Sequence, residues 1–597
     1  MGDKFFVQAI RAACPHDRHI ETPFTFPLSQ DETPLMDAVS PSPSPVHRPS
    51  NFSYSQLETP SVSVTRGSFV RDIPTVPVDD DRDVFLRRKY NGRIKTWPGL
   101  LLLVLVVGGA VAAMAYYGQQ NKETSDTRII NALQREKARK SIESGFEASS
   151  SSDNSIDGLL DQIRGPKEYP PTKCQLPSYE SRDGQIWAVA DNGTAIPISI
   201  KGINWSGMET EDMAPAGLWD DDSKAFGTTI TAITTFLANH KFNSVRLPLS
   251  VWNILQNKPL KKAIVNRNTN RAMDVSSYMA IIQSVTKALA FRGISVMISM
   301  HTLTPSETTG SWFSSTTSQE QFLTSIDMLT KALCTDDYWN ILGIDLKNEP
   351  FQSTWGTGGP NDWKAGAETI AARMLQGCPK WLAFVEGVWY QGGHEITFEG
   401  KPLAYADWFG GALQMAKQFP AKLSLPHKLV YAPHYYPPSV YPQEYYFDDV
   451  VSGPNGAFVQ YTELSDARLQ ARIDATMYDM FGFLRDDTKG PAVLLGEFGG
   501  LYTKDAHPLK TTQRCTKFTI QTMLKNGYAG GYIWTINPES KYDFNPSSTK
   551  MEVREGLLLD DWRAANEPFL QALEAMDKLP NLQPMPCFPI VGKPKTD

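Results

Sequence analysis

The chain has 597 residues and a net charge of −7, with 58 Lys and Arg against 65 Asp and Glu. Its 41% hydrophobic content, with 14 Trp, 22 Tyr and 28 Phe, can form a large core, which excludes a wholly disordered chain. Without a basic excess, no nucleic-acid partner is expected, and a neutral partner is favoured. The six Cys lack zinc-ligand spacing, so we expect no metal site.

An apolar stretch, residues 97–117, carries no charge and is long enough as a helix to cross a hydrocarbon core of about 30 Å. A signal peptide is disfavoured because the stretch begins far from the N-terminus. Five basic residues lie within 87–95, whereas only Lys122 and Arg128 follow closely. The sequence therefore predicts a transmembrane helix in a lipid bilayer, with a cytoplasmic N-terminus. We expect a single-pass type II protein of the plasma membrane or the Golgi, with its C-terminal part extracellular or lumenal.

The segments around this stretch differ in composition from the rest of the chain. Residues 1–96 contain scattered Pro and no sustained period, which predicts a disordered cytoplasmic tail. Residues 118–170 are rich in Ser, Lys and Glu and are expected to form a stalk. Residues 171–597 are expected to form the main folded domain. This domain opens with an alternating hairpin pattern at 186–200, predicted to close the base of the fold.

Beyond the hairpin, short apolar runs alternate with amphipathic helical stretches, which is typical of βα units. Helices are expected at 228–240, 277–293 and 511–527. Eight runs are expected to be strands: IKGIN, FNSVRLPL, ISVMISMH, ILGIDLKNEP, WLAFVEG, LVYAPHYY, AVLLGEF and GGYIWTIN. Eight such units predict an α/β fold, a (β/α)8 TIM barrel.

Polar residues end most of these strands, where a barrel of this type carries its active site. They are Arg246, His301, Asn348, Glu349, His434, Tyr436, Glu497 and Trp534. A single Glu after a strand is most often a solvated rim residue. Two Glu on separate strands facing one axis indicate a functional site, because like charges in a shared pocket cost free energy.

These motifs resemble glycoside hydrolase family 5, a family of retaining β-glycosidases. The Asn-Glu-Pro triplet after the fourth strand resembles the family's acid/base motif, which implies that Glu349 is the acid/base and that Asn348 lies beside the sugar 2-hydroxyl. The Glu of LLGEFG, Glu497, matches the nucleophile. The other positions carry implied roles: Arg246 and Tyr436 hold the nucleophile ionised, His301 and His434 line the reacting subsite, and Trp534 is its sugar platform. The resemblance implies no cofactor and no metal.

Longer stretches, such as GINWSGMET and WLAFVEGVW, resemble the actinobacterial type of endo-β-1,4-glucanase. The expected substrate is therefore a neutral β-glucan polysaccharide or oligosaccharide. Met300 and the segment 542–555 depart from that type at expected sugar contacts, so a β-1,3-glucanase stays an alternative. Transglycosylation and a glucan-binding wall sensor without catalysis are further alternatives. The paired Glu favour an enzyme over a sensor.

Tryptophans near the strand ends offer flat apolar faces to pyranose rings. We expect Trp205, Trp312 and Trp355 to contact substrate. Five Cys follow the predicted span, so at least one is not in an intramolecular pair. Cys334 with Cys378, at the bases of neighbouring strands, and Cys174 with Cys587, bracketing the domain, are the favoured pairs, although the sequence leaves the connectivity open.

Overall fold

The computed structural model describes residues 101–109, 111–112, 114, 116, 165–171, 173–219, 227–260, 264–307 and 309–590. The predicted tail 1–96, most of the predicted stalk and part of the predicted span 97–117 lie outside these residues. Residues 101–109 are helical. Among the described residues, we find no helix with the length and apolar character that crossing a membrane requires.

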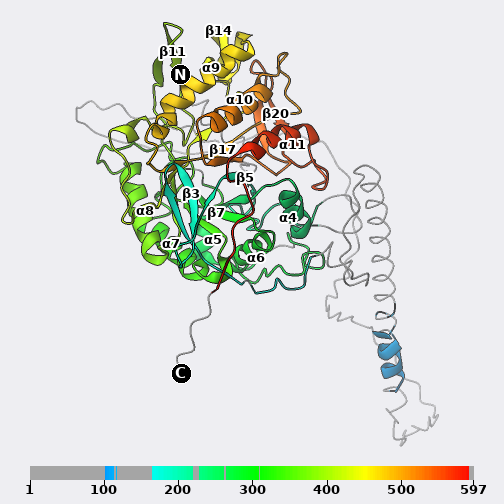
Figure 1. Cartoon of the computed structure of the whole chain (residues 1–597). Helices are drawn as coiled ribbons and strands as arrows, with labels where there is room; N and C mark the ends of the chain where they lie inside the picture. Colours follow the sequence, from blue (N-terminus) through cyan, green and yellow to red (C-terminus); the bar gives the residue numbers. More distant parts are fainter. Residues whose placement is uncertain are drawn as a thin grey trace, which may run out of the picture. The chain divides into compact units, whose positions relative to one another are not determined.

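The core of the domain is a barrel of parallel strands with helices outside it (Figure 1). The strands are β5 (Ile200–Asn204), β6 (Ser244–Ser250), β7 (Ser295–Thr302), β8 (Ile341–Asp345), β9 (Leu382–Val385), β12 (Leu429–Tyr431), β13 (His434–Tyr435), β16 (Ala492–Val493), β17 (Leu495–Phe498) and β18 (Gly530–Ile533). β12 and β13 are two parts of the sixth strand, and β16 and β17 are two parts of the seventh. Every one of the eight predicted strands is therefore present.

Pairing between the first and last strands closes the barrel. β18 pairs parallel with β5, where Gly530 lies opposite Ile200. The sixth and seventh strands join twice, through β12 with β16 and through β13 with β17. The structure thus confirms a closed parallel barrel, and the carboxyl ends of its strands meet at one rim.

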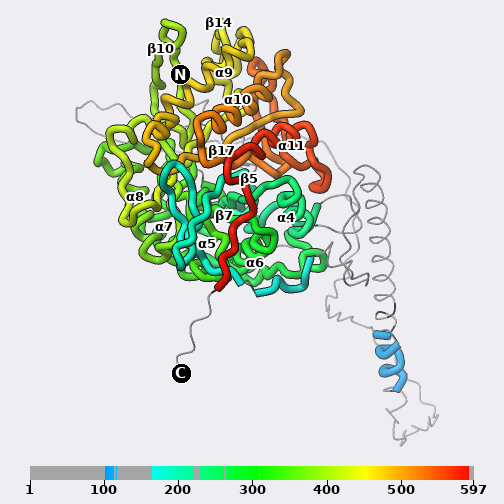
Figure 2. Tube along the Cα trace, viewed as in Figure 1, coloured from blue at the N-terminus to red at the C-terminus, as the bar shows by residue number. Residues whose placement is uncertain are grey.

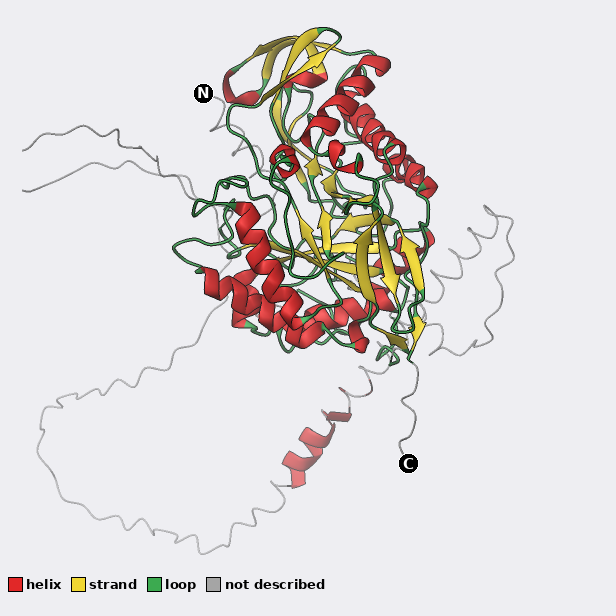
Figure 3. Ribbon diagram, turned by 60° about the vertical axis from the view of Figure 1, so that its left-hand side comes forward, coloured by secondary structure: helices red, strands yellow, loops and turns green. Residues whose placement is uncertain are grey.

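Helices run along the outside of the barrel (Figure 3). They are α4 (Ile230–Asn239), α5 (Val251–Gln256), α6 (Tyr278–Ala290), α7 (Gln319–Leu333), α8 (Trp363–Gly377), α9 (Asp466–Met480), α10 (Thr511–Lys525) and α11 (Glu567–Leu573). Side-chain caps begin several of them, as in α7, where Ser318 and Gln321 form a capping box. Short 3₁₀ turns lie at Asp336–Tyr338, Gln414–Lys417, Glu444–Tyr446, Pro454–Gly456, Gly482–Arg485 and Glu574–Lys578. The three helices predicted from the sequence correspond to α4, α6 and α10.

The fifth unit differs from the expected β-then-α repeat. Residues 386–428 are all described and contain no α-helix. Instead, β10 (His394–Phe398) and β11 (Lys401–Tyr405) form an antiparallel hairpin. The segment alternates polar and apolar residues between Gly pairs, a pattern that favours a hairpin over a helix.

Two further hairpins extend loops at the carboxyl ends of the strands. β14 (Phe447–Ser452) pairs with β15 (Phe458–Glu463), and β19 (Lys541–Phe544) pairs with β20 (Lys550–Arg554). The second hairpin occupies the segment that departs from the endo-β-1,4-glucanase pattern. It follows the eighth strand directly and therefore lies beside the predicted site.

The predicted hairpin at the start of the domain is part of a small sheet at the base. β2 (Ser178–Arg182), β3 (Gln185–Val189) and β4 (Ala195–Ile198) form this sheet. The Tyr179 N–H donates to Lys380 O at 2.8 Å, just before β9. The Ser181 N–H donates to His427 O at 2.8 Å, just before β12. These bonds attach the sheet to the amino ends of the strands, as predicted.

Both favoured disulfides are present. Cys174 bonds Cys587, and Cys334 bonds Cys378. The first joins β1 (Cys174–Gln175) to β21 (Phe588–Pro589), so the two ends of the domain run side by side (Figure 2). Cys515 on α10 is a buried free thiol.

Candidate active site

Glu497, at the end of β17, is held by two donors. Arg246 Nη1 donates to Oε1 of Glu497, and the Tyr436 hydroxyl donates to Oε2. Burial, together with the neighbouring carboxylates, raises the pKa of Tyr436 well above its ordinary value, so the hydroxyl keeps its proton and stays a donor. Both donors fix the orientation of the Glu497 carboxyl group, which a nucleophile requires for attack.

Glu349 lies opposite, just beyond β8. Its Oε1 is 3.1 Å from His434 Nδ1. Burial raises the pKa of Glu349, and the charge of Glu497 adds to that effect, while His434 opposes it. Burial is the largest of these effects. One carboxyl oxygen of Glu349, one ring nitrogen of His434 and one carboxyl oxygen of Glu497 all lie within 4.8 Å of one another.

His434, at the start of β13, connects the two carboxylates. Its Nδ1 lies 3.6 Å from Glu497 Oε2, and its Nε2 lies 3.1 Å from Glu386 Oε1. Burial disfavours the charged ring, yet the carboxylates of Glu386 and Glu497 hold the pKa of His434 well above its usual range. A charged His434 would stabilise negative charge on either side of it.

Arg246 is the centre of a buried polar network inside the barrel. Its Nη2 donates to Asp345 Oδ2 at 2.6 Å and to Asn348 Oδ1 at 2.8 Å. Its Nη1 also donates to Asn204 Oδ1 at 2.9 Å. Burial lowers the pKa of Arg246, but the surrounding carboxylates outweigh it and raise the pKa, so the cation that orients Glu497 persists. Asn348 is thus held by the guanidinium of Arg246, and its place beside a sugar 2-hydroxyl stays a prediction.

His301 and Trp534 form one wall of the site. Their ring centroids are 6.1 Å apart, and the ring planes differ by 10°. Trp534 Nε1 donates to Ser540 Oγ at 2.9 Å. Burial lowers the pKa of His301 well below its ordinary value, and its Nδ1 has no hydrogen-bond partner among the described residues. The His301 ring is therefore neutral, and its unpaired Nδ1 is buried away from solvent.

Trp205 and Trp355 do not lie where the sequence had placed them. Trp205 is fully buried, and its Nε1 donates to Ala216 O at 3.1 Å. Trp355 is also buried, and its Nε1 donates to Phe419 O at 2.9 Å. Trp312 packs edge-on against Phe322. Trp205 and Trp355 belong to the core, so the expectation that these two rings contact substrate is corrected, whereas contact with Trp312 stays a prediction. Polar residues next to a tryptophan in the sequence do not show whether its ring is buried in the folded domain.

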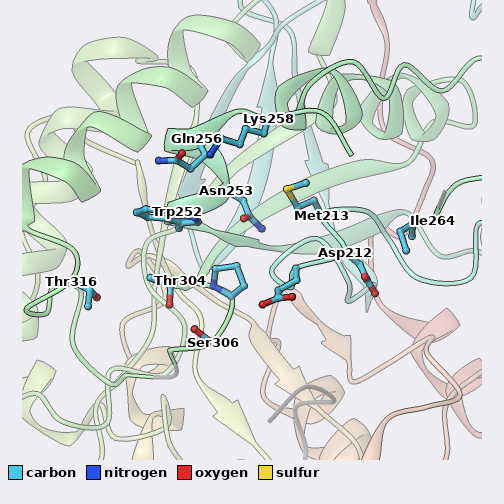
Figure 4. Close-up of a pocket in the computed structure, with 12 residues that line it drawn as sticks. Asp212, Met213, Trp252, Asn253, Gln256, Lys258, Ile264, Thr304, Ser306 and Thr316 are labelled. Atoms are coloured by element: carbon cyan, nitrogen blue, oxygen red, sulfur yellow. The ribbon is translucent and has the colours of Figure 1, made fainter. Parts of the chain in front are cut away.

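An exposed tryptophan beside the same rim is Trp252, whose side chain is 44% exposed. It lines a pocket of about 520 Å³. In Figure 4, Trp252, Asn253, Gln256 and Lys258 follow one edge of this pocket, and Thr304, Ser306 and Thr316 follow the other. The Trp252 N–H donates to Leu303 O at 2.9 Å, which ties α5 to the end of β7. The pocket therefore combines an apolar face with hydroxyl and amide groups.

Sequence reasoning missed three buried members of the site: Asn204, Asp345 and Glu386. Each is polar and lies in or directly after an apolar strand. That same signal had identified Arg246, and it was available for these residues too. The family resemblance directed attention to other motif positions instead.

The cluster of Glu349, His434 and Glu497 has the composition of a cation site. However, Arg246 and Tyr436 already donate to both oxygens of Glu497, and His434 Nδ1 faces Glu349. These donors neutralise the carboxylates without a metal. The arrangement fits a pair of reacting carboxyl groups.

Comparisons with known proteins agree with this geometry. Residues 191–540 match the cellulase family, glycosyl hydrolase family 5. An endoglucanase of Paenibacillus polymyxa is 27% identical over 375 residues, which are 62% of this chain and 80% of that protein. The major extracellular endoglucanase of Xanthomonas campestris pv. campestris is 26% identical over 394 residues, 65% of this chain and 69% of that protein.

Solved structures give the same result. An endocellulase from Pyrococcus horikoshii, crystallised as a complex with cellotetraose, has a TM-score of 0.54 to this chain at 26% identity. The match covers 68% of this chain and 100% of the endocellulase. Because the family match extends over more than half of the sequence, the chain belongs to the cellulase family, glycosyl hydrolase family 5, and is a glycoside hydrolase.

Proposed function

We propose that the chain is an endo-acting β-1,4-glucanase that hydrolyses its substrate with retention of configuration. The observation that carries this proposal is the facing pair of Glu349 and Glu497, which bring one carboxyl oxygen each to within 4.8 Å of the other. Retaining glycosidases have carboxyl groups about 5 to 5.5 Å apart, whereas inverting enzymes need about 6.5 to 9.5 Å to admit water. The separation supports a double displacement.

The reaction proceeds in two steps. The ionised carboxylate of Glu497 attacks the anomeric carbon, and the bond to the leaving oxygen breaks as Glu349 gives that oxygen its proton. Glu349, now ionised, then takes a proton from water, whose oxygen attacks the anomeric carbon and releases Glu497. Arg246 and Tyr436 hold the Glu497 carboxyl group in place by hydrogen bonds, and the raised pKa of Glu349 keeps that residue protonated for the first step.

The substrate is proposed to be a neutral β-1,4-glucan. The related proteins are named endoglucanases, and the Pyrococcus horikoshii endocellulase is described with cellotetraose. The test is a panel of carboxymethylcellulose, barley mixed-linkage glucan, β-1,3-glucan and mannan, with the Glu497→Gln chain as a matched control. We expect a rapid loss of carboxymethylcellulose viscosity that precedes the release of most reducing ends. Cleavage confined to β-1,3-glucan, or transfer to an added acceptor oligosaccharide in place of hydrolysis, would contradict this assignment.

A long glucan chain is proposed to extend from the reacting carboxylates to the Trp252 pocket. Thr304, on the edge of this pocket, is three residues from His301, which limits their Cα separation to about 11 Å. This distance is short enough for neighbouring sugars of one chain. The exposed face of Trp252 supplies the apolar surface on which a sugar stacks.

The Trp252→Ala change should therefore weaken action on long chains only. We expect kcat/KM for cellohexaose to fall about 5-fold, since one aromatic contact contributes roughly 1 kcal/mol. A chromogenic cellobioside should change little because it does not reach the pocket. Phe291→Ala serves as a control, since Phe291 is also exposed but follows α6 at the opposite end of the barrel. Equal losses on both substrates would contradict the extended site.

We also propose that residues 97–117 anchor the enzyme in a membrane, with the N-terminus cytoplasmic and the barrel at the cell surface or in the Golgi lumen. The basic excess before the stretch supports this orientation. Alkaline carbonate extraction should leave the chain in the membrane pellet. A tag at residue 1 should be detected only in permeabilised cells. Detection of that tag on intact cells would contradict the orientation.

A further inference from the structure

Glu386 is a buried carboxylate that the two-step reaction above does not use. It follows β9 directly and is fully buried. Its Oε2 accepts the backbone N–H of Glu349 at 2.8 Å. Its Oε1 lies 3.1 Å from His434 Nε2 and 3.3 Å from Arg246 Nη2. Both oxygens therefore contact groups that hold the reacting carboxyl groups.

The surroundings fix Glu386 in this position. Trp363 Nε1, on α8, donates to the Glu386 carbonyl oxygen at 2.9 Å. On the other side lies Gly410, where an added Cβ would be 2.3 Å from Glu386 Oε2 and 3.3 Å from His434 Cγ. The backbone of Glu386 is thus held by the Trp363 indole, and the absence of a side chain at Gly410 leaves room for its carboxylate.

The backbone of Glu349 requires such a partner. Its φ is +45°, in the left-handed region that residues with a Cβ rarely adopt. This conformation aims the side chain of Glu349 at His434 and Glu497, and it persists only where the surroundings impose it. The bond from the Glu349 N–H to Glu386 provides that constraint.

We propose that Glu386 is the positioning residue for the acid/base Glu349. Glu386 acts in two ways. Its Oε2 holds the backbone N–H of Glu349. Its Oε1 faces Nε2 of His434, and the other ring nitrogen of His434, Nδ1, contacts the Glu349 carboxyl group. The inference rests on the proposed role of Glu349. The other charged groups around Glu386 are Arg246 from β6, Asp345 from β8 and Lys347 beyond it.

A comparison of leaving groups tests this role in the full chain. A misplaced acid slows departure of a sugar, which needs a proton, much more than departure of dinitrophenolate, which does not. Glu386→Ala should lower kcat/KM for cellotetraose by about 100-fold, the usual cost of misplacing a catalytic group by about 1 Å. The same change should lower kcat/KM for dinitrophenyl cellobioside by less than about 5-fold. Equal losses on both substrates, or no loss on cellotetraose, would overturn the proposal.

Two further variants separate positioning from general stability. Glu386→Gln keeps an oxygen that can accept the Glu349 N–H, so it should recover part of the cellotetraose activity that the Ala variant loses. Adding Glu386→Ala to Glu349→Ala should cost little more on cellotetraose, because the group being positioned is already absent. Full additivity of the two changes would mean that Glu386 acts elsewhere.

A crystal structure of the Glu386→Ala chain gives a measurement that does not depend on activity. We expect Glu349 to leave its left-handed conformation and its contact with His434. An unchanged φ at Glu349 would overturn the inference. If the unaltered chain cleaves neither substrate, the proposed function fails, while this structure still decides the role of Glu386.

Discussion

Glu497→Gln should abolish turnover, with kcat lowered by at least about 10⁴-fold on every substrate, including activated aryl glycosides. The amide keeps the shape of the side chain but cannot attack the anomeric carbon. Because the nucleophile is needed whatever the leaving group, good leaving groups give no recovery. Steady-state kinetics measures the loss of turnover. Mass spectrometry with a fluorinated glycoside, which traps the glycosyl-enzyme, should show a covalent adduct on the unaltered chain and none on the variant.

This result also separates catalysis from glucan binding. The Gln variant should still bind cello-oligosaccharides, because the wall formed by His301 and Trp534 is unchanged. Calorimetry measures this affinity. If the unaltered chain and the variant bound equally and neither turned over, the wall-sensor alternative would replace the enzyme.

Glu349→Ala should show a different pattern. Hydrolysis of cellotetraose should fall by about 10²- to 10⁴-fold, the contribution typical of general acid–base catalysis. An aryl glycoside with a good leaving group should still form the glycosyl-enzyme, which then accumulates because water lacks its base. Added azide should restore turnover and give a β-glycosyl azide, since a charged nucleophile needs no base. Failure of azide to restore any turnover would contradict the assignment of Glu349.

The pH dependence follows from the same residue. Burial raises the pKa of Glu349, so the proton that the leaving group needs is retained to a higher pH than an ordinary carboxyl would allow. Accordingly, kcat/KM for cellotetraose should fall as pH rises through that raised pKa. The same decline should be absent in Glu349→Ala assayed with an activated aryl glycoside.

The barrel could be predicted because each of its strands is an apolar run of adequate length. The three additional hairpins could not, since they lie in loops whose course depends on local pairing. The fifth unit shows this clearly: residues 386–428 have the length of a βα connection, but Gly pairs and alternation direct them into β10 and β11.

Site residues could be predicted where they belong to a sequence motif. They could not be predicted where their exposure depends on the packing of segments distant in the sequence. Arg246, Tyr436 and Glu497 could be placed together because their strands end at one rim. Trp355 could not be distinguished from Trp252, since exposure of an indole is set by distant segments such as the one that carries Phe419. Asp345 and Glu386 lie at the ends of apolar runs and are fully buried, so the sequence pattern does not distinguish them from core residues.

The most direct test of the central claim is the configuration of the first product. Proton NMR of cellohexaose hydrolysis, recorded within the first minutes, distinguishes the β from the α anomer at the new reducing end before mutarotation mixes them. A double displacement through Glu497 and Glu349 predicts the β anomer. Initial release of the α anomer would mean that water attacks directly, and the proposed roles of both residues would then be wrong.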